Sequence, residues 1–211
     1  MSTSTRIKRV IPVALYTVFY LLCFTYLENR HVRYHIIDSS LDDKIPFCEY
    51  FIIPYLLWFV YVFATLALLF FDLKHLENYY QTIATLIIGM TASLLIYTLF
   101  PNAQNMRPTQ FTHDNIFTQV ISMLYATDTD TNVLPSIHVF NSLAIHAGLC
   151  RYATIHKQKI WRNGSFVLCL LICMSTLFLK QHSFLDVAAA IVLFMIVSWI
   201  TNILSRKRTT K

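Results

Sequence analysis

Residues 50–71 read YFIIPYLLWFVYVFATLALLFF, without a charged side chain in 22 positions. As an α-helix this stretch would be about 33 Å long, close to the roughly 30 Å hydrocarbon core of a bilayer. Similar blocks recur along the 211-residue chain, which is 56% hydrophobic and only 13% charged. A soluble domain carries about 25% charged residues. The sequence therefore predicts an integral membrane protein whose apolar surface is covered by lipid.

Six apolar blocks are expected to cross the membrane as helices. They cover residues 10–28, 50–71, 79–100, 136–153, 165–180 and 184–204. The fourth block is the least apolar, because it contains His138, Asn141, Ser142 and His146. A weakly apolar span usually faces protein or a polar cavity. We predict an all-α fold in which six transmembrane helices form one bundle, with a polar fourth helix inside it.

The rest of the chain adds little beyond this bundle. We expect a single domain over residues 1–211, with short basic tails at 1–9 and 205–211. The first block is interpreted as a retained helix, because no small-residue cleavage site of a signal peptide follows it. In the third connecting segment, 101–135, the apolar positions between Asn115 and Tyr125 fit one face of a helix, so a short surface helix is predicted there.

The basic residues indicate the orientation of the bundle. Twelve of the seventeen Lys and Arg lie on one side of the six-span arrangement: Arg6, Lys8, Arg9, Lys74, Arg151, Lys157, Lys159, Arg162, Arg206, Lys207, Arg208 and Lys211. Arg30, Arg33, Lys44, Arg107 and Lys180 lie on the other. By the positive-inside rule both termini are cytoplasmic, and segments 29–49, 101–135 and 181–183 are outside. The net charge of +6 therefore reflects membrane topology, and we expect no nucleic-acid partner.

His182 and Asp186 are four residues apart at the start of the sixth block, so a helix would place them on one face. A carboxylate that accepts a hydrogen bond from one imidazole nitrogen leaves the other nitrogen free as a nucleophile. The alternative is a helix-end ion pair at the membrane interface. The apolar neighbours of Asp186 favour a functional role, because a carboxylate in apolar sequence at a membrane edge is costly without a partner.

Three further groups are expected beside this pair. Pro135-Ser136-Ile137-His138 opens the fourth span, where the first-turn amides form an anion site, Ser136 adds a hydroxyl donor and His138 can protonate a leaving oxygen. Arg107 and Lys180 are cations suited to phosphate oxygens, although each alone is more often an interfacial residue. Five other His residues lie in segments near the interface and have no predicted role: His31, His35, His75, His113 and His156.

Together these motifs resemble the type-2 phosphatidic acid phosphatase superfamily, whose members are membrane phosphatases and phosphotransferases. The family has three sequence blocks: Lys and Arg-Pro, then Pro-Ser-Gly-His, then Ser-Arg followed by His and Asp. Arg107-Pro108 matches the end of the first block, and Pro135-Ser136-Ile137-His138 matches the second. Ser175, His182 and Asp186 match the third at the family's spacing. The order of the blocks and the six-helix layout also match.

The sequence departs from the family at three positions. The first-block Lys falls at Phe100, the second-block Gly at Ile137 and the third-block Arg at Thr176. The sequence around His138 and His182 is most similar to a branch that includes inositol phosphorylceramide synthases. In that branch the resemblance implies that Lys180 replaces a lost cation.

The resemblance implies a mechanism that needs no metal and no cofactor. His182 is then the nucleophile, Asp186 stabilises its ring, and His138 protonates the leaving group. Arg107, Lys180, Ser136 and the amides near Ile137 hold the phosphate oxygens. The expected substrate is a lipid phosphate at the extracytoplasmic face, in the plasma membrane. Two alternatives stay open: a phosphotransferase that passes a phospho-headgroup to a lipid alcohol, and a transporter or non-catalytic membrane protein.

Overall fold

The computed structural model describes residues 3–209, with side chains described from Arg9 to Arg206. The α-helices in this range are α1 (Thr3–Glu28), α2 (Ile52–Phe71), α3 (Leu76–Leu99), α4 (Ile116–Thr127), α5 (Ile137–Ile155), α6 (Lys159–Phe178) and α7 (Phe184–Thr209). Two short 3-10 helices, η1 (Asp42–Lys44) and η2 (Glu49–Phe51), precede α2. Two short strands, β1 (His35–Ile36) and β2 (Asn102–Ala103), complete the secondary structure.

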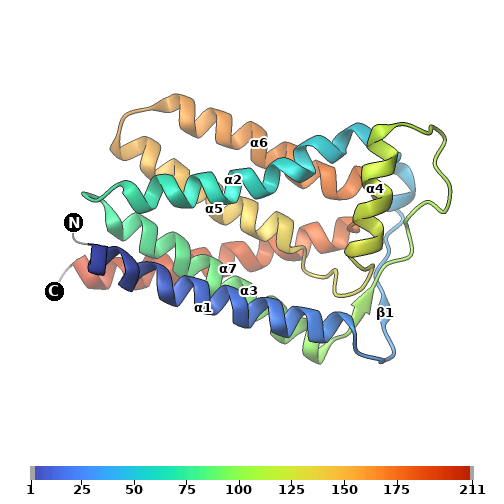
Figure 1. Ribbon diagram of the computed structural model, residues 1–211, viewed down its shortest axis with the longest axis horizontal. Coiled ribbons are helices and arrows are strands. Elements are labelled where there is room, and N and C mark those ends of the chain that lie inside the picture. Colours follow the sequence, from blue (N-terminus) through green and yellow to red (C-terminus); the bar gives the residue numbers. More distant parts are fainter. Residues whose placement is uncertain (1–2, 210–211) are drawn as a thin grey trace.

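The long helices run along one another, and both ends of the described chain lie at the same end of the bundle (Figure 1). Helix α4 lies across the opposite end (Figure 1). At that end β1 and β2 form a parallel pair, with His35 opposite Asn102, and Ala103 bridges to Thr131. This pair was not predicted from the sequence. It joins two long connecting segments over the end of the bundle where α5 and α7 begin.

Each predicted helix has an observed counterpart, although α6 begins at Lys159, six residues before its predicted start at residue 165. Helix α2 ends at Phe71, α3 ends one residue before its predicted end at residue 100, and α4 occupies the place of the short helix expected in segment 101–135. Helices α1 and α7 extend into the predicted tails at 1–9 and 205–211. The side chains of the basic tail residues Arg6, Lys8, Lys207, Arg208 and Lys211 lie outside the described residues.

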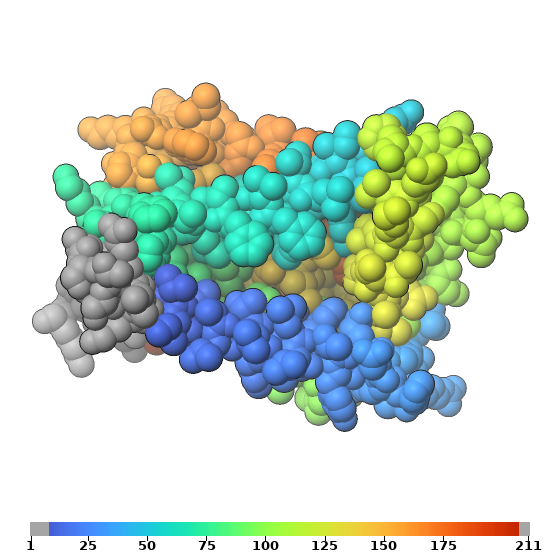
Figure 2. Space-filling model, viewed as in Figure 1, coloured from blue at the N-terminus to red at the C-terminus, as the bar shows by residue number. Residues whose placement is uncertain are grey.

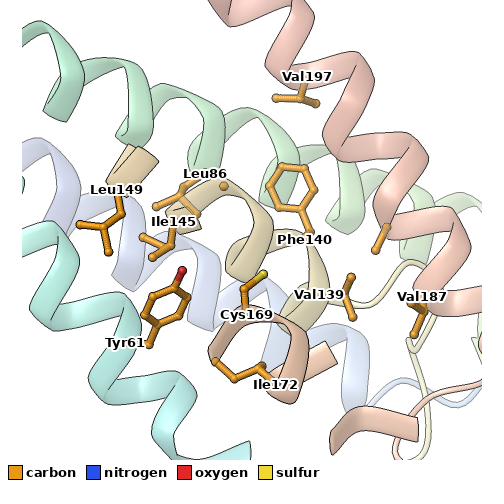
Figure 3. Close-up of a cluster of buried hydrophobic side chains, with 12 residues drawn as sticks. Tyr61, Leu86, Val139, Phe140, Ile145, Leu149, Cys169, Ile172, Val187 and Val197 are labelled. Atoms are coloured by element: carbon orange, nitrogen blue, oxygen red, sulfur yellow. The ribbon is translucent and has the colours of Figure 1, made fainter. Parts of the chain in front are cut away.

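Within the described residues, five helices are long and apolar enough to cross a membrane: α1, α2 with η2, α3, α6 and α7. Helix α5, which the sequence predicted as the fourth span, is not among them. It packs instead against α2, α3, α6 and α7. Its side chains Val139, Phe140 and Ile145 are completely buried in the main apolar core (Figure 3). The fold is therefore an all-α, membrane-type bundle, and α5 lies at its centre.

Helices α3 and α5 come into close contact in this core. An ideal Cβ atom built on Gly89 would lie 1.8 Å from Cζ of Phe140, so the backbone of α3 passes directly against the aromatic ring. Phe140 is completely buried. The absence of a side chain at position 89 is therefore what allows the two helices to approach.

Gly89→Ala is expected to lower the thermal stability of the protein in detergent. Overpacking a well-packed core typically costs about 1–3 kcal/mol, more than the roughly 1 kcal/mol by which Ala favours a helix over Gly. Gly164→Ala in α6 is the matched control, since a Cβ there meets nothing within 4 Å. Melting curves should move down for the first variant and up for the second. Equal shifts in the two variants would contradict the packing argument.

Candidate active site

His182 lies in the turn between α6 and α7, and Asp186 lies in the first turn of α7. Nδ1 of His182 is 3.3 Å from Oδ2 of Asp186, which also accepts a hydrogen bond from the Ser183 amide at 2.8 Å. Asp186 is completely buried, and His182 is 9% exposed. Because Nδ1 is directed at the carboxylate, Nε2 is the ring nitrogen available as a nucleophile. The structure thus brings the predicted pair together.

The end of α6 sets the position of His182. The amides of Gln181 and His182 both donate to the carbonyl oxygen of Thr176 at 3.0 Å. Lys180 has a φ of 52°, in the left-handed region that commonly ends a helix. The chain therefore reverses sharply after α6, and His182 is held by backbone hydrogen bonds before α7 begins.

Asp42, from η1, fixes the start of α7. Its carboxylate accepts hydrogen bonds from the Phe184 amide at 2.8 Å and from the Ser183 hydroxyl at 2.6 Å. The Lys180 ammonium donates to the carbonyl oxygens of Asp42 at 2.6 Å and Ile45 at 2.5 Å. Lys180, predicted as a phosphate-binding cation, therefore anchors the 42–45 loop in this structure. Asp42 is a positioning residue that the sequence analysis missed, because it lies about 140 residues from its partners.

His138 lies in the first turn of α5, and its ring is in contact with two aromatic side chains. The centroid of its ring is 4.6 Å from that of Tyr55 and 4.6 Å from that of Trp58. The rings of His138 and His182 are 6.0 Å apart between centroids, at 57° to one another. Both line one cavity. A small group held in this cavity can therefore touch both imidazoles, as two-residue acid–base and nucleophilic chemistry requires.

Ser136 and Ile137 connect the start of α5 to this pair. The Ser136 hydroxyl oxygen accepts a hydrogen bond from the Val139 amide at 3.4 Å, and the Ser136 amide donates to the carbonyl oxygen of Asp186 at 3.2 Å. Ser136 is completely buried, whereas Ile137 lines the cavity. The predicted serine therefore acts as the N-cap of α5 and ties it to α7. Ser136 itself is not among the residues that line the cavity.

The guanidinium of Arg107 lies beside the site and is held by the protein. Nη1 donates to the carbonyl oxygens of Asp128 at 2.7 Å and Tyr125 at 3.3 Å, and Nη2 donates to that of Thr129 at 2.8 Å. Nη2 also donates to Oε1 of Gln181, while the buried Nε has no partner. Arg107 is thus one side chain removed from His182, and it organises the segment after α4.

Three buried amide side chains that the sequence analysis did not select line the cavity: Asn132, Asn141 and Gln181. Nε2 of Gln181 and the Oδ1 atoms of Asn132 and Asn141 have no hydrogen-bond partner. An unpartnered buried polar atom costs about 1–3 kcal/mol, so these atoms are prepared to bind a polar ligand. The one sequence signal was local: Gln181 precedes His182, and Asn141 lies one helical turn after His138.

Asp128, the C-cap of α4, contributes an acidic side chain to the wall of the same cavity. Its Oδ2 atom accepts a hydrogen bond from the Tyr55 hydroxyl at 3.3 Å. Burial raises the pKa of the Asp128 carboxyl above its ordinary value, and the charges of His182 and Arg107 offset this only in part. A carboxyl that is easily protonated repels an anionic ligand less than an ordinary aspartate does.

The cavity has a volume of about 570 Å³ and is lined by both polar and apolar side chains. Its polar lining includes Asp128, Asn132 and Gln181 beside the two His side chains, and its apolar lining includes Phe24, Val62, Phe63, Leu66 and Met90. These apolar residues come from α1, α2 and α3. Figure 2 shows the hollow between α1 and α2, with α5 behind it. The shape and lining suit an amphiphile with a polar head and an apolar chain.

Within the described residues, the close groups of metal-ligating side chains do not include His138 or His182. The arrangement of the site is that of a histidine, a carboxylate directed at its Nδ1 atom and a second histidine. These candidate residues lie on α5, on α7 and on the turn before α7, and Arg107 joins them through Gln181.

Comparison with curated proteins and with solved structures gave no match. A family model described as the PAP2 superfamily matches residues 102–210, just over half of the chain. The match extends from β2 into α7 and includes Arg107, His138, His182 and Asp186. It confirms the resemblance drawn from the three sequence blocks, while the narrower similarity to inositol phosphorylceramide synthases stays a prediction. The chain is an integral membrane protein of the PAP2 superfamily.

Proposed function

We propose that this protein hydrolyses a phosphate ester or diphosphate on a membrane lipid through a phosphohistidine at His182. The observation that carries the proposal is the cavity, which joins the two His rings to an apolar channel. Members of the superfamily are in general phosphatases or phosphotransferases. A lipid phosphate would place its head between His138 and His182 and its chain between α1 and α2.

The reaction proceeds in two steps. Nε2 of His182 attacks phosphorus while the bond to the leaving oxygen breaks, and His138 donates its proton to that oxygen. Asp186 stabilises the positive charge that develops on the His182 ring. Water then attacks the phosphohistidine, His138 takes the water's proton, and the phosphorus–nitrogen bond breaks. Inorganic phosphate leaves, and both imidazoles return to their starting forms.

The phosphate oxygens need positive charge or hydrogen-bond donors around them as the transition state forms. We assign this role to Arg107, Lys180, Ser136 and the amide of Ile137, assisted by Nε2 of Gln181. Arg107 and Lys180 now donate to backbone carbonyls, so a phosphate would replace some of these partners. Apo sites commonly tighten in this way when substrate binds.

The proposal includes a membrane placement. Helix α5 crosses the bilayer as the fourth of six spans, shielded from lipid by α2, α3, α6 and α7. Both termini are then cytoplasmic, because the basic residues gather at that end. The active site faces the extracytoplasmic side, and the plasma membrane is the proposed location.

A phosphotransferase is the second candidate, and the unpartnered Oδ1 atoms of Asn132 and Asn141 favour it. Two buried acceptors in the cavity wall can accept hydrogen bonds from the hydroxyl of an incoming lipid alcohol. The phosphohistidine would then pass its group to that alcohol instead of water. The same residues serve both reactions, so the acceptor must be determined by experiment.

Purified protein is expected to release phosphate from at least one member of a panel of lipid monophosphates and diphosphates. Vanadate should inhibit the release, because it takes the five-coordinate geometry of the transition state, and chelators should leave the initial rate unchanged. Repeating the panel with a lipid alcohol separates transfer from hydrolysis. A His182→Ala preparation controls for contaminating phosphatase.

Two results would count against this function. One is the absence of both release and transfer from every lipid in the panel. The other is an activity that chelators remove and a divalent ion restores, which would replace the metal-free mechanism.

A further inference from the structure

Three metal-ligating side chains converge at the end of the bundle opposite the active site. Asp72 is the C-cap of α2, His75 is the N-cap of α3, and His156 is the C-cap of α5. Nδ1 of His75 is 3.1 Å from Oδ1 of Asp72, and Nε2 of His156 is 2.7 Å from Oδ2. The three ligand atoms all lie within 4.8 Å of one another. In the part of the chain that the structure describes, no other group of three comes this close.

Helix ends hold these ligands in place. The His75 amide donates to the carbonyl oxygen of Asp72 at 3.1 Å, and the His156 amide donates to that of Tyr152 at 2.9 Å. The ring of Tyr152 lies 4.2 Å from the ring of His156 between centroids. The C-terminal ends of α2 and α5 meet at this point, and helix C-termini carry partial negative charge that favours a cation.

The exposure of the three side chains fits a site that is open on one side. The side chain of Asp72 is 9% exposed, and those of His75 and His156 are each 31% exposed. The carboxylate therefore lies beneath two imidazoles whose outer edges reach solvent. An ion held by all three would keep at least one position open to water.

We propose that Asp72, His75 and His156 form a binding site for a divalent transition-metal ion, such as Zn²⁺, that links the α2–α3 turn to the α5–α6 turn. Two imidazoles and one carboxylate are ligands that these ions prefer. In a tetrahedral site, metal–ligand bonds of about 2.0–2.2 Å place neighbouring ligand atoms roughly 3.3–3.6 Å apart. To the same Asp72 oxygen, Oδ2, the present spacings are 2.7 Å from His156 and 3.2 Å from His75, and all three ligand atoms lie within 4.8 Å of one another. The imidazoles therefore need only to close around the ion.

The test uses the full-length protein, purified without a polyhistidine tag and stripped of metal. Co²⁺ is added, its visible absorption bands are recorded, and Zn²⁺ is then titrated in to displace it. We expect one ion per chain and a rise in melting temperature with Zn²⁺. His156→Ala and His75→Ala should each weaken Zn²⁺ binding at least about 100-fold, the upper end of the effect of losing an outer-shell partner.

His113→Ala is the matched control, because His113 pairs with the single carboxylate of Glu49 at 3.0 Å near the other end of the bundle. It should leave Zn²⁺ affinity unchanged, as should His182→Ala. His156→Gln replaces His156→Ala if the alanine variant does not fold. Wild-type protein that shows no saturable binding would overturn the proposal. So would affinity that survives in the His75 and His156 variants or that falls equally in either control.

Discussion

His182→Ala is expected to abolish turnover of every phosphorylated substrate, by a factor on the order of 10⁴ or more. The variant has no nitrogen to form the bond to phosphorus, so neither step of the reaction can proceed by this route. The turnover rate of Asp186→Asn should lie between that of His182→Ala and that of the wild type. The amide still accepts the hydrogen bond from the Ser183 amide but no longer balances a charged ring.

The measurement is phosphate release together with trapping of the phosphoenzyme in alkaline denaturant, where phosphohistidine survives. Labelled protein should appear for wild type and not for His182→Ala. His146→Ala is the matched control, since this second α5 histidine contacts Ser165 and does not line the cavity. Each variant must elute as a monodisperse species in detergent. Substantial activity in His182→Ala would show that His182 is not the nucleophile.

His138→Ala is expected to slow the reaction with a lipid phosphate by about 100-fold to 10,000-fold, the usual contribution of a general acid. The loss should be much smaller for an aryl phosphate, whose leaving group needs little protonation. The informative quantity is therefore the ratio of the two losses in kcat/KM. It does not depend on how much active protein each preparation contains.

The packing of His138 between Tyr55 and Trp58 requires one further variant. His138→Gln fills more of this space than alanine and cannot act as a general acid, so it should show the same dependence on the leaving group. An equal loss on both substrates in both variants would assign His138 to positioning. If His138→Ala has no activity even on the aryl phosphate while His182→Ala keeps its activity, the roles of the two histidines are reversed.

Hydropathy was sufficient to predict the helices because lipid imposes a simple rule. Each span must be long and apolar, as residues 50–71 are, and the observed α2 ends where that stretch ends. Helix α5 follows a different rule, since protein and not lipid surrounds it. Its polarity predicted an interior position, which the packing against α2, α3, α6 and α7 confirms.

The candidate site was predictable where its contacts are local in sequence. His182 and Asp186 are four residues apart, and Ser136 caps the helix that directly follows it. The surroundings of Lys180 and Arg107 were not predictable, because their partners come from distant connecting segments. Charge alone places a lysine near the site, but it does not show that backbone carbonyls already hold the ammonium.

The hollow between α1 and α2 has a consequence for the kinetics. A molecule that enters through the side of the bundle arrives from within the plane of the bilayer. Its encounter rate then depends on its mole fraction among the surrounding lipids and not on its molarity in the sample. Diluting the substrate with an inert phospholipid should slow turnover at constant total amount, whereas adding buffer should not. The rate of such an enzyme is thus set by the mole fraction of substrate in the bilayer.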